Sequence, residues 1–302
     1  MVPEASGPPP HAVRIVVERA LAEDLDPIGD LTAALIPPAL VATGSFVARE
    51  AGVVAGTACL AEAFHQVDPL VMVNLELGDG SRMEAGSIVA TVSGPLRSIL
   101  TAERTALNFA CHLSGVATMT ARFADVAHRS NPSVRILDTR KTTPGLRALE
   151  KAAVRAGGGF NHRGSLSEGV LIKDNHLAAL SIPDAVREAM GRFPGRMVEV
   201  ECDRLDQALE AVDAGATMIL LDNMSPDDVA GCIAAVRLRS RGTGVLVEVS
   251  GGVTLETVGP LAAAGVDLIS VGALTHSAAA VDIGLDIEPQ AEPQAPSPGA
   301  PG

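Results

Sequence analysis

Residues 197–201, MVEVE, and residues 218–222, MILLD, are two short apolar runs that each end in a carboxylate. Four further apolar runs recur in this half of the chain: VRILD at 134–138, VLIKD at 170–174, VLVEV at 245–249 and LISVG at 268–272. Helical segments separate them, such as RLDQALEAVDAG at 204–215 and TLETVGPLAAAG at 254–265. Strands that alternate with helices are typical of right-handed βαβ units. This half of the chain is therefore predicted to contain a parallel sheet covered by helices.

Polar or small residues occupy the carboxyl ends of these predicted strands. They are Asp138, Lys173, Glu201, Asp222, Ser250 and Gly272. A parallel α/β barrel places its active site at the carboxyl ends of its strands. Six strands are too few for the closed eight-stranded form. We therefore expect an incomplete parallel α/β barrel as the catalytic domain, over residues 116–276.

The first 115 residues have a different pattern and are predicted to form a smaller α/β domain. Residues 11–25 show the apolar period of a helix, and short β-rich pieces separated by turns fill residues 43–93. A helical stretch follows from about Leu100 to Arg129, with an interruption expected near Gly115.

The chain ends give three further expectations. Residues 1–13, MVPEASGPPPHAV, have no basic region followed by an apolar stretch, so no signal peptide is expected. Part of residues 277–287 is expected to join the N-terminal domain. Residues 288–302, EPQAEPQAPSPGAPG, have no apolar period and are expected to be disordered.

Composition excludes several classes of partner. The net charge of −13 argues against nucleic-acid binding, which needs a positive surface. No apolar run approaches the ~20 residues of a membrane span. The four cysteines show no CxxC spacing, which favours buried thiols in a reducing compartment over a metal site. We therefore expect a cytoplasmic protein.

Against this acidic background, residues 138–176 form a local cationic stretch. They contain seven lysines and arginines against four acidic residues, and they hold all three lysines of the chain: Lys141, Lys151 and Lys173. A lysine supplies a compact point charge that arginine does not replace. A local pocket can reverse the global sign of charge, so this stretch is predicted to be an anion site.

Two motifs supply the cations. In DTRKTTPGLRALEK, 138–151, Arg140 and Lys141 follow a strand, and GGGFNHRGSLSEGVLIKDNH, 157–176, supplies the others. The predicted site residues are Arg140, Lys141, His162, Arg163 and Lys173. One carboxylate needs only one bidentate arginine, so several cations indicate a ligand with several negative charges. The remaining cations, Arg147, Lys151 and Arg155, are expected to form a solvated helix face.

Carboxylates and small residues complete the predicted mouth of the barrel. Glu199 and Glu201 lie on one face of their strand, and Asp222 ends the next strand. Glu201 and Asp222 are candidates to hold Mg²⁺, directly or through waters, although an ion pair with the nearby cations is the alternative. Small residues after the last two strands allow backbone N–H groups to approach a phosphate. The phosphate candidates are Ser250, Gly251, Gly252, Gly272 and His276.

These motifs resemble one known family along most of the chain. The segments are ERTALNFACHLSGVAT at 103–118, LDTRKTTPGLRALEKAAVRAGGGFNHRGSLSEGVLIKDNH at 137–176, VEVE at 198–201, LLDN at 220–223, VEVSGG at 247–252 and ISVGALTH at 269–276. They are similar to quinolinate phosphoribosyltransferase, also called nicotinate-nucleotide pyrophosphorylase (carboxylating), over about residues 11–287.

The resemblance implies a fold and a reaction. The fold is a type II phosphoribosyltransferase-like barrel with an N-terminal α/β sandwich, which closes over the barrel of the partner subunit in a homodimer. The reaction is transfer of phosphoribose from phosphoribosyl pyrophosphate to quinolinate with loss of CO₂, giving nicotinate mononucleotide for NAD synthesis. The cofactor is Mg²⁺.

The resemblance also assigns roles to residues. Quinolinate is bound by Arg140, His162, Arg163 and Lys173, with Arg104 reaching the pocket from the partner subunit. Lys141, Glu201 and Asp222 serve the sugar donor and the metal, together with the small residues after the last two strands. Lys141, Lys173, Glu201 and Asp222 are the expected catalytic residues.

Three alternatives remain open at this point. Lys173 at a strand end is compatible with a Schiff-base aldolase. The chain is also compatible with a paralogue of the same fold that acts on another ligand. A catalytically inactive binding protein on this scaffold is the third, although an inactive site has no physical reason to keep so many like charges together.

Overall fold

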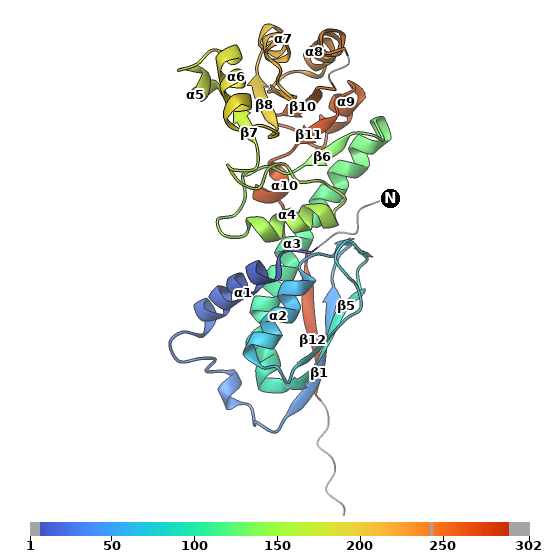
Figure 1. Cartoon of the computed structure of the whole chain (residues 1–302). Helices are drawn as coiled ribbons and strands as arrows, with labels where there is room; N and C mark the ends of the chain where they lie inside the picture. The colour runs from blue at the N-terminus through green and yellow to red at the C-terminus, as the bar shows by residue number, and fades with distance from the viewer. Residues whose placement is uncertain (1–6, 242–243, 290–302) are drawn as a thin grey trace, which may run out of the picture. The chain divides into compact units, whose positions relative to one another are not determined.

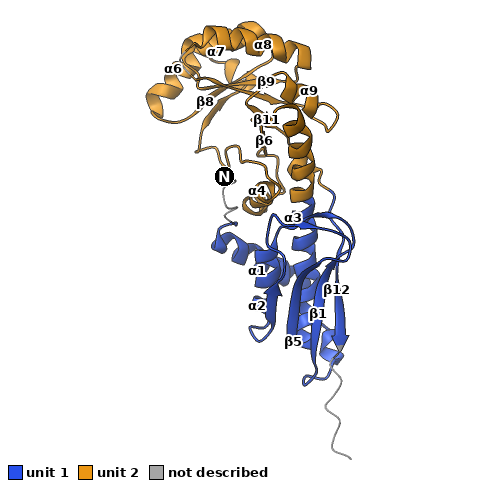
Figure 2. Ribbon diagram, turned by 90° about the vertical axis from the view of Figure 1, so that its right-hand side faces the viewer, with its two compact units in different colours: residues 1–115, 279–302 blue, residues 116–278 orange. Residues whose placement is uncertain are grey.

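The computed structural model describes residues 7–241 and 244–289 of the chain. These residues form two compact units (Figure 2). Unit 1 comprises the residues up to Gly115 and those from Ala279 onward, and unit 2 comprises Val116–Ala278. None of the helices in the described ranges is long and apolar enough to cross a membrane.

Unit 1 is an antiparallel sheet packed against helices. Its elements are α1 (Pro10–Leu25), a 3₁₀ turn (Ala33–Leu35), β1 (Val41–Ala48), β2 (Gly52–Val53), α2 (Thr57–Val67), β3 (Met72–Leu75), β4 (Arg82–Met83), β5 (Ile88–Pro95), the first part of α3 (Leu96–Ser130) and β12 (Ile283–Pro289). The main sheet has the order β12-β1-β5-β3, and β2 pairs with β4. Phe46 of β1 and Phe64 of α2 are fully buried and meet edge to face, with ring centroids 5.8 Å apart. This contact joins one face of the sheet to the helical layer of the predicted sandwich.

Strand β12 shows where the C-terminal segment returns to unit 1. It pairs antiparallel with β1 from Ala48↔Ile283 to Ala42↔Pro289. Glu288 and Pro289, which were expected to begin a disordered tail, belong to this strand, because β1 offers them an unpaired edge. The rest of that expected tail lies outside the described residues.

Helix α3 corrects the expectation of an interruption near Gly115. The helix runs without a break from Leu96 to Ser130. Gly115 is required by packing instead, since a Cβ at this position would collide with the carbonyl oxygen of Ala279. A single glycine destabilises a helix by only about 1 kcal/mol, and packing of the returning segment against Gly115 offsets this cost.

Unit 2 contains all six predicted strands in one sheet (Figure 1). They are β6 (Arg135–Leu137), β7 (Val170–Ile172), β8 (Val198–Cys202), β9 (Met218–Asp222), β10 (Leu246–Ser250) and β11 (Leu268–Ser270). The order is β6-β11-β10-β9-β8-β7, and every pairing is parallel. Within the described residues β6 and β7 are the edges and do not pair with each other, so the barrel is incomplete as predicted.

Helices connect these strands. They are α4 (Arg147–Ala156), α5 (Asp174–Leu177), α6 (Ile182–Arg192), α7 (Leu205–Ala214), α8 (Pro226–Arg239), α9 (Val258–Ala263) and α10 (Ala273–His276). Of these, α6, α7 and α9 pack against the sheet. Local sequence sets their starts: Ser181 and Ser225 cap α6 and α8 by accepting the N–H groups of Asp184 and Asp228, each at 3.2 Å. Because all six strands are parallel, their carboxyl ends lie at the same edge of the sheet.

Candidate active site

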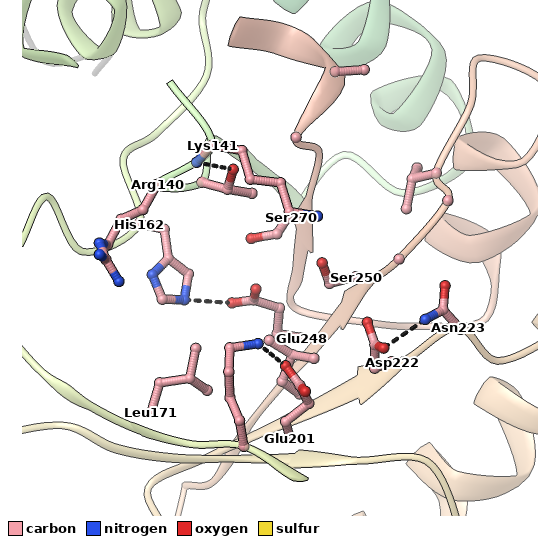
Figure 3. A pocket seen from close by; sticks show the side chains of 18 of the residues that line it. Arg140, Lys141, His162, Leu171, Glu201, Asp222, Asn223, Glu248, Ser250 and Ser270 are labelled. Carbon is pink, nitrogen blue, oxygen red and sulfur yellow. Dashed lines mark hydrogen bonds and ion pairs between the residues drawn. The ribbon is translucent and has the colours of Figure 1, made fainter. Parts of the chain in front are cut away.

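A pocket of about 630 Å³ opens at the carboxyl ends of the strands of unit 2 (Figure 3). This volume lies in the range of pockets that enclose small molecules. Every predicted site residue of unit 2 lines the pocket: Arg140, Lys141, His162, Arg163, Lys173, Glu201, Asp222, Ser250, Gly251, Gly252, Gly272 and His276. Arg104 belongs to unit 1, where it is exposed on α3. The sequence therefore located one common site for the barrel residues, while the role of Arg104 stays a prediction.

Two arginines, Arg140 and Arg163, form a cationic wall of the pocket. Arg163 donates from Nη1 to the carbonyl oxygen of Gly169 at 2.9 Å. Burial and the charge of neighbouring Arg140 lower the pKa of the Arg163 guanidinium. The Nε of Arg140 is buried and has no hydrogen-bond partner within the described part of the chain. Like charges held together in this way favour a bound anion.

Lys141 lies in the loop after β6 and is fixed through its main chain. Its N–H donates to Thr139 Oγ1 at 3.0 Å, and its carbonyl oxygen accepts from Thr275 Oγ1 at 2.7 Å. A Cβ at Gly272 would lie 3.0 Å from His276 Nε2 and 3.4 Å from Lys141 Cδ. A side chain at Gly272 would therefore press on His276, and the glycine leaves the backbone N–H groups after β11 open to a phosphate.

The carboxylates predicted to bind metal lie on neighbouring strands. Glu201 of β8 forms an ion pair with Lys173, and Asp222 of β9 accepts from Asn223 Nδ2 at 2.6 Å. Gly251 follows β10 with φ at +90°, and a Cβ there would collide with Asn223. Both carboxylates line the pocket and offer the hard oxygen ligands that Mg²⁺ prefers. The Lys173 amine is held beside a carboxylate at the strand ends.

A second acidic group lies deeper, below His162. The Nε2 of His162 is 3.0 Å from Glu199 Oε2. It is 3.5 Å from Glu248 Oε2, the carboxylate that Figure 3 shows beside the ring. Both glutamates are fully buried, and Glu248 lies too deep for the solvent to stabilise its charge. Burial and the adjacent charge of Glu199 raise the pKa of Glu248 to about 8. Burial opposes a positive His162, but Glu199 and Glu248 outweigh it and raise the pKa of this ring.

Glu248 was missed in the sequence, although a signal was present. It lies two residues before Ser250 on β10, so strand alternation points both side chains to the same face. A carboxylate at that position in the apolar run VLVEV faces the barrel interior. The donor atoms of His162, Glu199 and Glu248 lie within 4.8 Å of one another, a geometry that also fits a small cation.

The expected solvated face of α4 is wrong. Lys151 is buried, forms an ion pair with fully buried Asp138 and donates from Nζ to the carbonyl oxygen of His162 at 2.8 Å. Arg147 donates to Thr142 Oγ1 at 3.0 Å and to the Gly164 carbonyl at 3.1 Å. Arg155 bonds to the side-chain oxygen of Asn161 and to the Lys151 carbonyl. These cations turn toward the loop after β6 and the loop before β7 because buried polar groups there need donors.

Fold and pocket first define a class: an open α/β barrel with an anion-binding site at the carboxyl ends of its strands. Comparison with known proteins then narrows it. Residues 30–114 match the N-terminal domain of quinolinate phosphoribosyl transferase, and residues 116–286 match its C-terminal domain. The chain therefore belongs to the quinolinate phosphoribosyl transferase family, and its barrel has the type II phosphoribosyltransferase fold.

Three similar proteins illustrate the match. A nicotinate-nucleotide pyrophosphorylase (carboxylating) of Mycobacterium leprae is 44% identical over 282 residues, which cover 91% of this chain and 97% of that protein. A quinolinate phosphoribosyltransferase (decarboxylating) of Nicotiana glauca is 38% identical over 93% of this chain and 83% of its own. The solved nicotinate-nucleotide pyrophosphorylase of Francisella tularensis has a TM-score of 0.86 and 37% identity, covering 93% of this chain and 97% of that structure.

Proposed function

We propose that this chain transfers phosphoribose from phosphoribosyl pyrophosphate to quinolinate with loss of CO₂, producing nicotinate mononucleotide and pyrophosphate. The reaction supplies de novo NAD synthesis. One observation carries the proposal: a single pocket holds the cations Arg140, Lys141, Arg163 and Lys173 together with two carboxylates at neighbouring strand ends. Quinolinate is a dianion and the sugar donor is a polyanion, so a site for both needs this density of positive charge.

The cations divide the pocket into two sides in this proposal. Arg140, Arg163 and Lys173 face the two carboxylates of quinolinate. Lys141 and the small residues after β10 and β11 receive the phosphates of the donor. Support for the donor side comes from Gly251 and Gly272, where a side chain would collide with Asn223 or press on His276.

Glu201 acts at the reacting carbon in the proposed mechanism. Departure of pyrophosphate leaves positive charge on the ribose, which a nearby carboxylate stabilises. Lys173 holds Glu201 by an ion pair and so fixes the position of that carboxylate. Once the ribose is attached, the cationic ring nitrogen of the ribosylated intermediate stabilises the carbanion that loss of CO₂ leaves at carbon 2. That carbanion takes a proton from water to give nicotinate mononucleotide, so decarboxylation needs no separate base.

Glu201 and Asp222 are the residues that would hold Mg²⁺, directly or through waters. Their support is chemical: both are oxygen donors, both line the pocket, and they come from adjacent parallel strands. When bound with the donor, Mg²⁺ neutralises part of the pyrophosphate charge.

We propose further that the enzyme is a homodimer in which Arg104 completes the partner's quinolinate site. Arg104 is exposed in unit 1, while its helix neighbours Leu107 and Phe109 are buried and anchor it. Unit 1 also exposes large apolar side chains, including Leu70 at 72% and Met72 at 69%. Exposed apolar surface of this kind is typical of association sites.

All four cysteines are free, which supports the reducing cytoplasm as the location.

The test is an assay with quinolinate, phosphoribosyl pyrophosphate and Mg²⁺ that follows CO₂ and nicotinate mononucleotide. Quinolinate should be converted and nicotinate should not, because nicotinate lacks the 2-carboxylate and leaves part of the cationic wall unpaired. Comparable turnover of nicotinate would refute the assignment of substrate. Absence of turnover with either acid would refute the reaction itself.

A further inference from the structure

Asn223, the residue directly after β9, has a left-handed backbone. Its φ is +56°, and it is the one non-glycine residue with a positive φ in the described part of the chain. A side chain makes this conformation unfavourable, although the short polar side chain of asparagine tolerates it better than most. Residues held in such conformations persist where the surrounding structure fixes them, and they cluster at functional sites. The backbone of Asn223 therefore indicates a functional role for this position.

Two strand ends meet at Asn223. Its backbone N–H donates to the carbonyl oxygen of Ser250 at 3.0 Å, and Asp222 and Ser250 are partners in the parallel pairing of β9 with β10. Its side-chain Nδ2 donates to Asp222 Oδ2 at 2.6 Å (Figure 3). All three residues line the pocket, so Asn223 links the end of β9 to the loop after β10 at the site itself.

The orientation of the Asn223 amide follows from its two neighbours. An ionised carboxylate can only accept, so the amide nitrogen faces Asp222 and the amide oxygen faces the other way. On that side a Cβ at Gly251 would lie 2.3 Å from Asn223 Oδ1 and 2.8 Å from the Asn223 backbone nitrogen. The amide therefore fills the place that a side chain at Gly251 would occupy, and it packs against the backbone of this loop.

The two carboxylates at neighbouring strand ends are held in different ways. Glu201 forms an ion pair with Lys173. Among the described residues, the bond from Asn223 is the one hydrogen bond that the Asp222 side chain accepts. This bond engages Oδ2, which leaves Oδ1 as the oxygen available to a metal ion or its waters.

We infer that Asn223 is a positioning residue for the sugar donor: its amide orients the Asp222 carboxylate and supports the backbone at Gly251. The inference rests on the proposed function, in which Asp222 serves the metal and residues 250–252 receive a phosphate. A hydrogen-bond partner behind a metal-binding carboxylate sets the orientation of that carboxylate. The alternative is a purely local role, in which Asn223 only completes the turn after β9.

The first test, Asn223→Gly, separates these two roles. Glycine adopts a positive φ without strain and keeps the backbone N–H for Ser250, but it lacks the amide. We expect this variant to keep the wild-type melting temperature and the wild-type Kd for quinolinate alone, measured by ligand-observed NMR. The KM for phosphoribosyl pyrophosphate and the half-saturating Mg²⁺ concentration should rise, so that kcat/KM for the donor falls about tenfold to a hundredfold. An unchanged kcat/KM for the donor, or an equal loss of quinolinate affinity, would overturn the inference.

The second test is a double-mutant cycle on the contact with Gly251. Gly251→Ala introduces a Cβ that collides with the Asn223 amide, whereas the Asn223→Gly background has no amide at this place. The strain of alanine at a φ of +90° is common to both backgrounds and cancels in the cycle. We expect the loss of kcat/KM caused by Gly251→Ala to be at least about threefold smaller in the Asn223→Gly background. Equal losses in both backgrounds would show that the amide does not support this loop, and the inference would fail.

Asn74→Gly is the matched control. Asn74 Nδ2 donates to Glu76 Oε1 at 2.6 Å, a bond of the same kind and length at a position that does not line the pocket. This variant should keep the wild-type kcat/KM for the donor, and a loss equal to that of Asn223→Gly would reject the positioning role. A wild-type protein that neither binds quinolinate nor converts it would instead refute the proposed function, whereas an active wild type with an unimpaired Asn223→Gly variant would refute only this inference.

Discussion

Replacing Lys151 by methionine removes a buried charge while keeping most of the side-chain volume. The partner of Lys151 is Asp138, whose side chain is fully buried, while that of Lys151 is 8% exposed. Removing one partner of a buried ion pair costs about 3–5 kcal/mol, because the other charge is left uncompensated. Asp138 keeps hydrogen bonds from Asn161 and the His162 N–H, so the lower end applies, about 3 kcal/mol. For a domain of this size, the melting temperature should fall by about 6–12 °C.

The assay is thermal and urea unfolding of Lys151→Met beside a matched surface control. Arg187 pairs with Asp184 on α6, but its side chain is 74% exposed. Arg187→Met should therefore leave the melting temperature unchanged within error. Adding Asp138→Asn to Lys151→Met should recover part of the lost stability, since the uncompensated charge is then gone. A loss below about 1 kcal/mol in Lys151→Met would refute the reasoning, because it is the value of a solvated ion pair.

The loss should also depend on pH with a definite sign. Burial raises the pKa of Asp138, and Lys151 opposes that rise. Without Lys151 the folded pKa rises further above the unfolded value. A carboxyl group with a raised folded pKa is stabilised by its proton at low pH and loses that stability as pH rises through the folded pKa. Lys151→Met should therefore be less destabilised at pH 5 than at pH 8, and equal losses would contradict the account.

Three further predictions concern the site and the assembly. Glu201→Ala and Asp222→Ala should reduce turnover severely while calorimetry shows little change in quinolinate binding to the free enzyme; collapse of that binding in both variants would place them on the wrong side of the pocket. Homodimers of Arg104→Ala and of Arg163→Ala should each be nearly inactive. Exchange of subunits between the two variants should restore about a quarter of wild-type activity, because half the dimers are then mixed and each mixed dimer has one intact site. If mass spectrometry proves the exchange and no activity returns, Arg104 has no role across the interface. The pKa of Glu248 in the folded protein, about 8, lies above its ordinary value of 4.5, so its contribution to stability falls as the pH rises from 4.5 to 8. Glu248→Gln should therefore make the melting temperature depend less on pH in this range. An unchanged pH dependence would show that Glu248 is already ionised.

The sequence predicted the barrel well because its strands carry a redundant signal. Each apolar run is short, is followed by a helical segment and ends in a polar or small residue, so one misjudged position changes little. Asp222 and Gly272 illustrate this, since strand-end position alone placed both at the pocket that the structure contains. The roles of these residues within the pocket stay predictions.

Other features depend on contacts that a single sequence does not encode locally. Gly115 resembles a helix breaker, yet it is retained because a distant segment passes against it. The period of α4 shows which residues share a face, but not that Asp138 lies under that face and takes Lys151 as its partner. Glu248 was missed because an apolar run drew attention to its neighbours. For Gly115 and Asp138 the deciding contact comes from another part of the chain, whereas the strand position of Glu248 already indicated its direction.

The return of β12 to unit 1 has a consequence for synthesis on the ribosome. Strand β1 lies between β5 and β12, and the whole of unit 2 is translated between β1 and β12. Until residues 283–289 leave the exit tunnel, β1 presents an open row of N–H and C=O groups to other nascent chains. The barrel can form during translation, because its strands are contiguous in the chain, whereas the sandwich can be completed only afterwards. The growing polypeptide therefore carries an unpaired edge on β1 throughout the synthesis of unit 2.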